Sequence, residues 1–126
     1  MNFTRTGIIL VTENYTECVR FYQETLGLGL LFALDNEHSR LTSLDMGGGN
    51  YLMIETGGHG VTGAKDYRQN PVWIRFNVQD VESASAALQA KGIDVNIRRE
   101  PWGTVADFTD PDGNVCSFRD EASFGQ

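Results

Sequence analysis

The sequence predicts an α+β fold in which one structural module occurs twice. The order strand, helix and three strands is indicated by apolar periodicity and turn residues in each half of the chain. The residues expected to bound the two helices are also evenly separated. Asn14 lies 66 residues before Asp80, and Gly27 lies 65 before Gly92, so the two halves stay aligned to within one residue.

The first module is expected to begin with a short apolar strand over residues 7–12. A helix follows, with apolar positions at helical spacing: Tyr15, Cys18, Val19, Tyr22 and Leu26. Gly27 can end this helix in the left-handed conformation. Three strands are then expected at roughly 28–34, 39–46 and 50–55, because Asp-Asn-Glu and Gly-Gly-Gly segments between them favour turns.

The second module repeats this order. Residues 72–78 alternate as a strand, and Asp80 can cap the helix that follows. The apolar face of that helix comprises Val81, Ala84, Ala87 and Leu88. Gly92 is placed to end the helix, and strands are expected at 93–98, 104–108 and 115–118.

A chain of 126 residues fits a single domain with its own core. We expect module one over about 5–56, a Gly-rich linker over about 57–70, and module two over about 71–120. The linker lacks the Walker spacing and the following helix that a phosphate-binding loop needs. It is therefore expected to be a mobile connection or a flap over a cavity.

Composition excludes several function classes. Ten Lys and Arg against 17 Asp and Glu give a net charge of −7, which opposes binding to nucleic acid or anionic membranes. Cys18 and Cys116 are too few for a disulfide framework and fall on apolar faces, so both are expected to be buried. His38 and His59 are expected at the surface. Without a signal-like or membrane-spanning apolar run, a cytoplasmic protein is expected.

The segment 102–114 indicates a strand, a tight turn and the start of another strand. In Asp110-Pro111-Asp112-Gly113, Pro111 presets φ and Gly113 accepts a positive φ, which favours a turn. Asn114 can bond to nearby backbone. Turn chemistry alone indicates no function.

This hairpin resembles the terminal hairpin of the vicinal oxygen chelate superfamily, which includes glyoxalase I, extradiol dioxygenases, fosfomycin-modifying enzymes and bleomycin-resistance proteins. Phe21-Tyr22 followed by Leu26-Gly27 is similar to the end of that family's first helix. Residues 77–81 and 91–93 are similar to its second. The resemblance covers nearly the whole chain. It implies two βαβββ modules that form a cupped mixed sheet, with helices on the convex side and a cavity on the concave side.

The resemblance also implies four cavity-facing positions at which metal-using members carry His, Gln or Glu. In this chain they fall on Gly7, Met53, Trp73 and Ser117. None of these side chains is a good ligand for a divalent cation, and only Glu55, near the second position, offers a suitable oxygen. We therefore expect no metal site and no cofactor.

Five residues are predicted to bind a ligand in the cavity: Trp73, Arg75, Tyr51, Glu55 and Trp102. Trp73 and Tyr51 can form flat apolar walls, although a filled interior is the alternative. Arg75 on a mostly buried strand needs an acceptor, which is either Glu55 or a carboxylate or phosphonate of a ligand. Trp102 is expected mainly to pack at the rim, with ligand contact as the alternative.

The leading hypothesis is a metal-independent small-molecule binding protein, similar to bleomycin-resistance proteins that sequester their ligand. The alternative is a metal-dependent lyase, isomerase or dioxygenase of the same superfamily with ligands at other positions. A third is an interaction domain with a filled interior. No nucleophile and base are recognisable, so no catalytic residue is assigned. Acidic composition favours a cationic aromatic ligand, whereas Arg75 favours an acid. The resemblance implies a homodimer.

Overall fold

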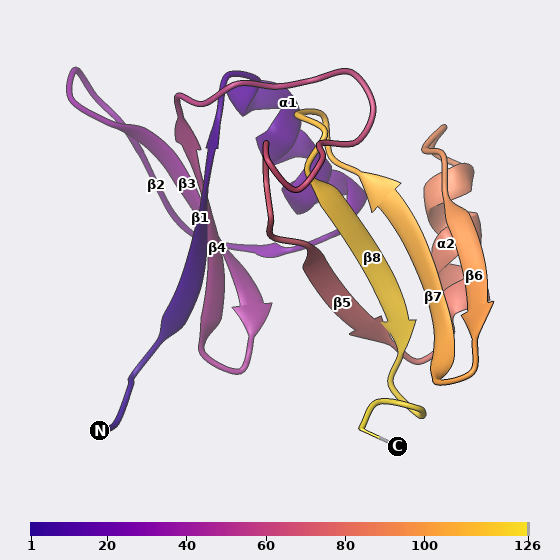
Figure 1. Cartoon of the computed structure of the whole chain (residues 1–126). Helices are drawn as coiled ribbons and strands as arrows, with labels where there is room; N and C mark the ends of the chain where they lie inside the picture. The colour runs from indigo at the N-terminus through magenta and orange to yellow at the C-terminus, as the bar shows by residue number, and fades with distance from the viewer. Residues whose placement is uncertain (126) are drawn as a thin grey trace. The chain divides into compact units, whose positions relative to one another are not determined.

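The computed structural model describes residues 1–125 and contains two compact units, Met1–Gly60 and the residues from Val61 onward. Each unit has a four-stranded mixed sheet and the same order of elements, one strand, a helix and three strands (Figure 1). This confirms the predicted α+β class and the repeated module. The assignment of both modules to a single domain stays a prediction.

The first unit consists of β1 (Thr6–Thr12), α1 (Tyr15–Arg20), β2 (Gly29–Asp35), β3 (Arg40–Gly47) and β4 (Asn50–Thr56). The strands lie in the order β1-β4-β3-β2, with β1 parallel to β4 and the other pairs antiparallel. After α1 the chain continues as a π-helical turn, Phe21–Thr25, and leaves the helix at Gly27, where φ is +80°. The expected end of this helix is confirmed.

The core of the first unit lies between its helix and one face of its sheet. Alternation along β1 and β4 turns Leu10, Leu52 and Ile54 toward this core, where they are buried. The helical segment contributes Cys18 and Tyr22, both fully buried. The opposite face of the sheet therefore carries the remaining strand residues, among them Gly7, Tyr51, Met53 and Glu55.

The second unit consists of β5 (Ile74–Val78), α2 (Val81–Gln89), β6 (Asn96–Glu100), β7 (Gly103–Thr109) and β8 (Val115–Asp120). Its strand order is β5-β8-β7-β6, the counterpart of the first sheet, again with the first and last strands parallel. α2 packs against β7 and β8. The core between them is buried and comprises Ile74, Val81, Leu88, Ala106, Phe108, Cys116 and Phe118. As expected, Cys18 and Cys116 are both buried.

Three local predictions for the second unit were wrong. β5 begins at Ile74 rather than 72, because the Val72 N–H donates to Asn70 Oδ1 at 3.0 Å in a turn. β6 begins at Asn96 rather than 93. The Ile93 N–H donates instead to the Leu88 carbonyl at 3.1 Å and closes the end of α2.

The third concerns the buried face of α2, which includes Ser85, whereas Ala87 is exposed. Since Ser85 follows Val81 by four residues, the two side chains lie on the same side of the helix.

No helix within residues 1–125 is long and apolar enough to cross a membrane.

Candidate functional site

The polar face of the second sheet is the one that points away from α2. Strand register places Arg75 beside Ser117, Ser117 beside Asp107, and Asp107 beside Asn96. These four residues form one row across all four strands, because directly paired residues point to the same face. We call this set the Arg75 row.

A cavity of about 540 Å³ opens at the end of the sheet where β5 and β8 begin. Its lining includes Tyr67, Trp73, Asn96, Asp107, Thr109 and Val115. The volume lies within the range of about 300–1,000 Å³ that is usual for small-molecule sites. Trp73, which directly precedes β5, is 36% exposed, so part of its indole surface is available to a ligand.

One wall of the cavity is formed by the Gly-rich linker, through residues 64–67. The Lys65 N–H donates to the Gly113 carbonyl at 2.8 Å, and Lys65 Nζ donates to Asn114 Oδ1 at 2.9 Å. Asn70 Nδ2 donates to the same oxygen, also at 2.9 Å. The linker is therefore fastened to the turn between β7 and β8, as a cavity wall requires.

That turn is prearranged to receive the linker. Asp110 Oδ1 accepts the N–H groups of Asp112 and Asn114 at 2.8 and 2.9 Å, and Asp110 Oδ2 accepts Asn114 Nδ2 at 2.8 Å. Gly113 has a φ of +87°, and a Cβ there would contact the Gly63 carbonyl oxygen at 2.5 Å. Glycine is needed for the backbone angle and for the close approach of the linker.

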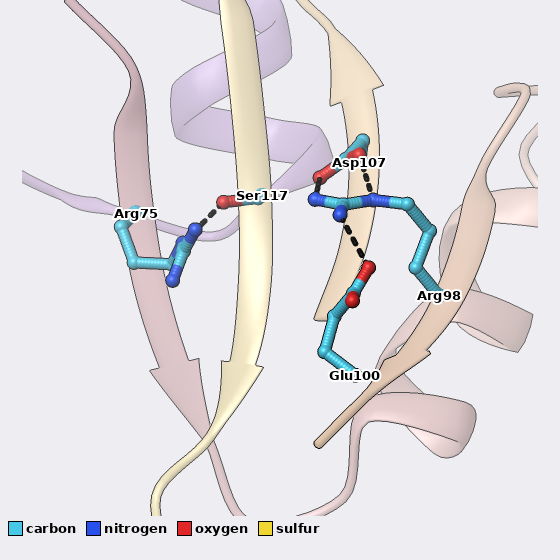
Figure 2. A network of polar contacts seen from close by, with 5 residues as sticks. All are labelled: Arg75, Arg98, Glu100, Asp107 and Ser117. Carbon is cyan, nitrogen blue, oxygen red and sulfur yellow. Dashed lines mark hydrogen bonds and ion pairs between the residues drawn. The ribbon is translucent and has the colours of Figure 1, made fainter. Parts of the chain in front are cut away.

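Arg75 lies on β5, two residues after Trp73, and is not itself part of the cavity lining, although Asp107 and Asn96 of the Arg75 row are. Figure 2 shows its side chain directed toward Ser117. Its Nε–H donates to the hydroxyl of Ser117, which is fully buried. Partial burial, followed by the nearby Arg119 guanidinium, lowers the pKa of Arg75, and the Asp107 carboxylate opposes that shift. The protonated side chain is therefore held by a neutral acceptor in a site that disfavours its charge.

The carboxylate of Asp107 is occupied by a different arginine. Arg98 Nε and Nη2 donate to the two oxygens of Asp107 at 2.7 and 3.3 Å, and Arg98 Nη1 donates to Glu100 at 2.8 Å (Figure 2). The hydrogen bond to Asp107 is the largest cause that raises the pKa of Arg98. This forked contact fixes both side chains on the polar face.

Trp102 lies at the other end of the same sheet, in the turn between β6 and β7. It lines a separate hollow with Gly103, Asp120 and Ser123, and its ring lies 4.7 Å from the Arg119 guanidinium carbon. The five residues of β5 correspond to roughly 16 Å between the two ends. The structure therefore does not place Trp102 in the cavity that Trp73 lines.

Tyr51 belongs to the first unit, where it lines a cavity of about 400 Å³ with Arg5, Leu31, Phe32, Ser43 and Met53. Its ring fills the space beside Gly7, its neighbour across the strands, and a Cβ on Gly7 would overlap the ring. Glu55 shares this face of the sheet between Val11 and Leu41. Glu55 and Arg75 belong to different units, so their pairing stays a prediction.

The four positions at which the resemblance implies metal ligands do not fit a metal. The Tyr51 ring takes the space that a ligand side chain at Gly7 would need. Ser117 accepts a hydrogen bond from a cationic guanidinium, and Met53 and Trp73 offer no oxygen or imidazole. Residues 1–125 also contain no group of three or more His, Cys, Asp or Glu side chains arranged to hold an ion.

Sequence analysis missed the residues that build the cavity wall. Lys65 and Tyr67 carry no recognisable motif, and the hairpin motif that includes Asn114 did not indicate its bonds to Lys65 and Asn70, which join segments 44 to 49 residues apart. It also missed the Arg98–Asp107 pair. The signal available there was alternation, because Arg98 and Asp107 fall on the same face of neighbouring strands once the register is known.

The comparisons with known proteins agree on the fold. Residues 5–118 match the family model described as the Glyoxalase/Bleomycin resistance protein/Dioxygenase superfamily. Among solved structures, the chain is 23% identical to TnmS3, an antibiotic-binding protein from Streptomyces sp. CB03234, with a TM-score of 0.74 and coverage of 95% of this chain and 96% of that one.

A lactoylglutathione lyase from Agrobacterium tumefaciens is 18% identical, with a TM-score of 0.73 and 96% of both chains covered. A glyoxalase/bleomycin resistance protein from Streptomyces sp. CB03234 is 24% identical, with a TM-score of 0.67 and coverage of 91% and 98%. No curated protein matches the chain. At these identities the structural similarity indicates a shared fold only.

Proposed function

Because this chain belongs to the Glyoxalase/Bleomycin resistance protein/Dioxygenase superfamily, we propose that it binds a small organic molecule without a metal ion. The observation that carries this proposal is the cavity of the second unit. It combines a partly exposed indole, apolar strand residues and a wall of linker residues fastened by hydrogen bonds. A preformed cavity of this kind binds a ligand with little loss of conformational entropy.

The metal-independent part of the proposal rests on the donor set. Gly7, Met53, Trp73 and Ser117 are poor ligands, and two of these positions are taken by other groups, the Tyr51 ring and the Arg75 guanidinium. A metal-dependent lyase, isomerase or dioxygenase would need a different donor set. TnmS3, a protein of the same fold, is an antibiotic-binding protein, which is the kind of role proposed here.

We place the ligand against Trp73 and beside Arg75. Tyr51 and Glu55, which share one face of the first sheet, stay proposed as ligand contacts of that unit. Trp102 has less support as a ligand contact, because its ring lies against Arg119 at the far end of the sheet. Substitutions at each tryptophan therefore test the two ends of the sheet separately.

The chain has only two tryptophans, so the tryptophan fluorescence of a Trp102→Phe variant comes from Trp73 alone. We expect aromatic acids or cations from a compound library to raise its melting temperature and to change Trp73 fluorescence. At a hundredfold excess over Kd, binding stabilises the native state by about 3 kcal/mol. A Trp73→Ala variant should lose this response.

A Trp102→Ala variant discriminates between the two ends of the sheet. Retained binding places the ligand at Trp73, whereas loss of binding shows that the ligand also reaches Trp102. If hits survive the Trp73→Ala change, the proposed cavity is not the binding site. If no compound from the library binds, an interaction domain becomes the better description.

We also propose a homodimer in the cytoplasm. β2 is one of the two outer strands of the first sheet, and it exposes the large apolar side chains Leu30, Leu31, Phe32 and Leu34. An apolar outer strand of this kind favours association with a second chain. Sedimentation equilibrium should give twice the mass of 14.0 kDa, and a Phe32→Lys variant should shift the protein toward the monomer.

A further inference from the structure

We infer that the ligand carries an anionic group and that the Arg75 guanidinium binds it. This inference rests on the proposed function, because it assigns the charge of the molecule that occupies the same cavity. Arg75 follows Trp73 by two residues and pairs directly with Ser117 on β8.

The hydrogen bonding of Arg75 leaves most of its donors available. A guanidinium has five N–H groups, and the Nε–H of Arg75 donates to Ser117. Within residues 1–125, neither Nη atom of Arg75 has a hydrogen-bond or ion-pair partner. Since the Nε contact fixes the plane of the group, the two Nη atoms form a fork that matches a carboxylate or a phosphonate.

The charges on the polar face also point to an anion. Its strand residues include three arginines, Arg75, Arg98 and Arg119, but only two carboxylates, Asp107 and Glu100. Arg98 binds both carboxylates. The face therefore keeps an excess of positive charge although the whole chain carries −7.

Arg119 is engaged elsewhere. Its Nη2 donates to the carbonyls of Trp102 and Ser123, each at 3.1 Å, and its guanidinium also lies over the rings of Trp102 and Phe124. Arg119 Nε is buried without a hydrogen-bond partner, but Arg119 Nη2 is taken, so among these three arginines Arg75 is the one whose two Nη atoms are both open. An anion at Arg75 would offset both causes that lower its pKa, the partial burial and the repulsion from Arg119.

The cavity and the Arg75 row are adjacent, and the distance between them indicates the size and shape of the ligand. Trp73, Val115 and Thr109 line the cavity, and Arg75 lies two residues beyond Trp73, about 7 Å along the strand. Asp107 belongs to the Arg75 row and also lines the cavity. A flat apolar body about two rings wide can therefore rest on Trp73 while its acid group reaches Arg75.

The cavity mouth has carboxylates as well, which makes a cationic ligand the competing outcome. Asp66 is already bonded, because its Oδ1 accepts the N–H groups of Arg68 and Gln69, both at 2.9 Å. Asp94 is exposed. Both carboxylates line the cavity but are exposed, whereas Arg75 is half-buried, so water screens both more strongly than it screens Arg75.

Three probes with one skeleton test the inference: 2-naphthoate, 2-naphthamide and 2-naphthylmethylammonium. Isothermal titration at neutral pH should show that the anion binds about tenfold more tightly than the neutral amide, or better, as expected for a charge-assisted fork. An Arg75→Gln variant should reduce the affinity for naphthoate to that for the amide and leave the affinity for the amide unchanged. Arg75→Lys should retain part of the preference.

Arg99→Gln is the matched control. It removes the same charge from β6, but Arg99 points to the other face and pairs with Glu82 of α2. Its affinity for naphthoate should equal that of the unaltered chain. If Arg75→Gln fails to fold, as judged by circular dichroism, the Arg75→Lys and Ser117→Ala variants carry the test, and both should reduce the preference for naphthoate.

The outcomes separate this inference from the proposed function. If the amide binds as tightly as naphthoate, or if the ammonium compound binds best, the inference about Arg75 is overturned while small-molecule binding stands. If naphthoate is preferred but Arg75→Gln keeps the preference, another cation is responsible. If none of the three probes binds, both the inference and the proposed cavity fail.

Discussion

At the scale of single residues, the identity of individual side chains determines which groups can occupy the family's four metal-ligand positions. Gly7 has no side chain, so the Tyr51 ring lies where a ligand side chain would project. Ser117 is buried, and its hydroxyl accepts the Nε–H of Arg75. In this chain, Gly7 therefore makes room for the Tyr51 ring, and Ser117 positions the Arg75 side chain.

The contact between Gly7 and Tyr51 can be measured by a double-mutant cycle. We expect Gly7→Ala to cost about 1 kcal/mol more stability in the unaltered chain than in a Tyr51→Ala background, because the new Cβ must displace the ring. Urea unfolding provides the four free energies. Gly29→Ala on β2 is the control, since a Cβ there meets nothing within 4 Å. Equal costs in both backgrounds would show that the ring does not occupy this space.

At the scale of elements, local interactions position the cavity. Lys65 and Asn70 both bond to the Asn114 side chain, which Asp110 holds in turn, and backbone bonds from Val61 and Lys65 also join the linker to this turn. β5 begins late because Asn70 caps the turn before it. The Asn114 amide is thus one of several contacts that join two segments far apart in sequence.

Removing one of these contacts should loosen the wall. In Asn70→Ala, two hydrogen bonds of the Asn70 side chain are lost, and each contributes about 1 kcal/mol. We expect chymotrypsin to cut at the exposed Tyr67 at least fivefold faster, because local opening becomes more frequent. Asn36→Ala, which removes the side chain that orders a turn of the first unit, should leave this rate unchanged. An unchanged rate in Asn70→Ala would mean that the linker is fastened by other contacts.

α2 should give the chain an acid-dependent stability. Asp80 caps the helix by accepting the Ser83 N–H at 3.1 Å, and this bond, followed by the Ser83 hydroxyl, lowers the pKa of Asp80. A lowered folded-state pKa stabilises the chain above the unfolded-state pKa, and this stabilisation is lost as pH falls through the folded-state pKa.

The test compares the chain with Asp80→Asn, which keeps a capping oxygen but cannot titrate. We expect the variant to have a lower urea midpoint at pH 7, because it lacks the negative charge at the helix start. The two midpoints should converge as pH falls through the lowered folded-state pKa of Asp80. A difference that stays constant with pH would contradict a role for ionised Asp80.

At the scale of the whole molecule, the proposed function predicts that neither stability nor ligand binding depends on a metal ion. Melting temperature and ligand affinity should be the same after purification with a chelator and after addition of Zn²⁺, Ni²⁺, Mn²⁺ or Fe²⁺. The physical reason is that the four family positions supply no suitable donor set. Metal analysis of protein purified without a chelator provides the second measurement. One divalent ion per chain, lost together with ligand binding, would favour the metal-dependent enzyme.

The sequence by itself determined the repeated α+β module, the two helix ends at Gly27 and Gly92, and the absence of good ligands at the four family positions. These features depend on local chemistry, namely apolar periodicity, backbone angles that favour glycine, and side-chain identity. They can be recognised without knowing which segments meet in space.

Only the tertiary structure decided how the cavity is built. It joined the linker to the last turn, placed Arg75 on Ser117, paired Arg98 with Asp107, and separated Trp73 from Trp102. Each of these depends on strand register or on contacts between distant segments. A shift of register by one residue would turn every side chain on a strand to the opposite face, so sequence alone left these partners open.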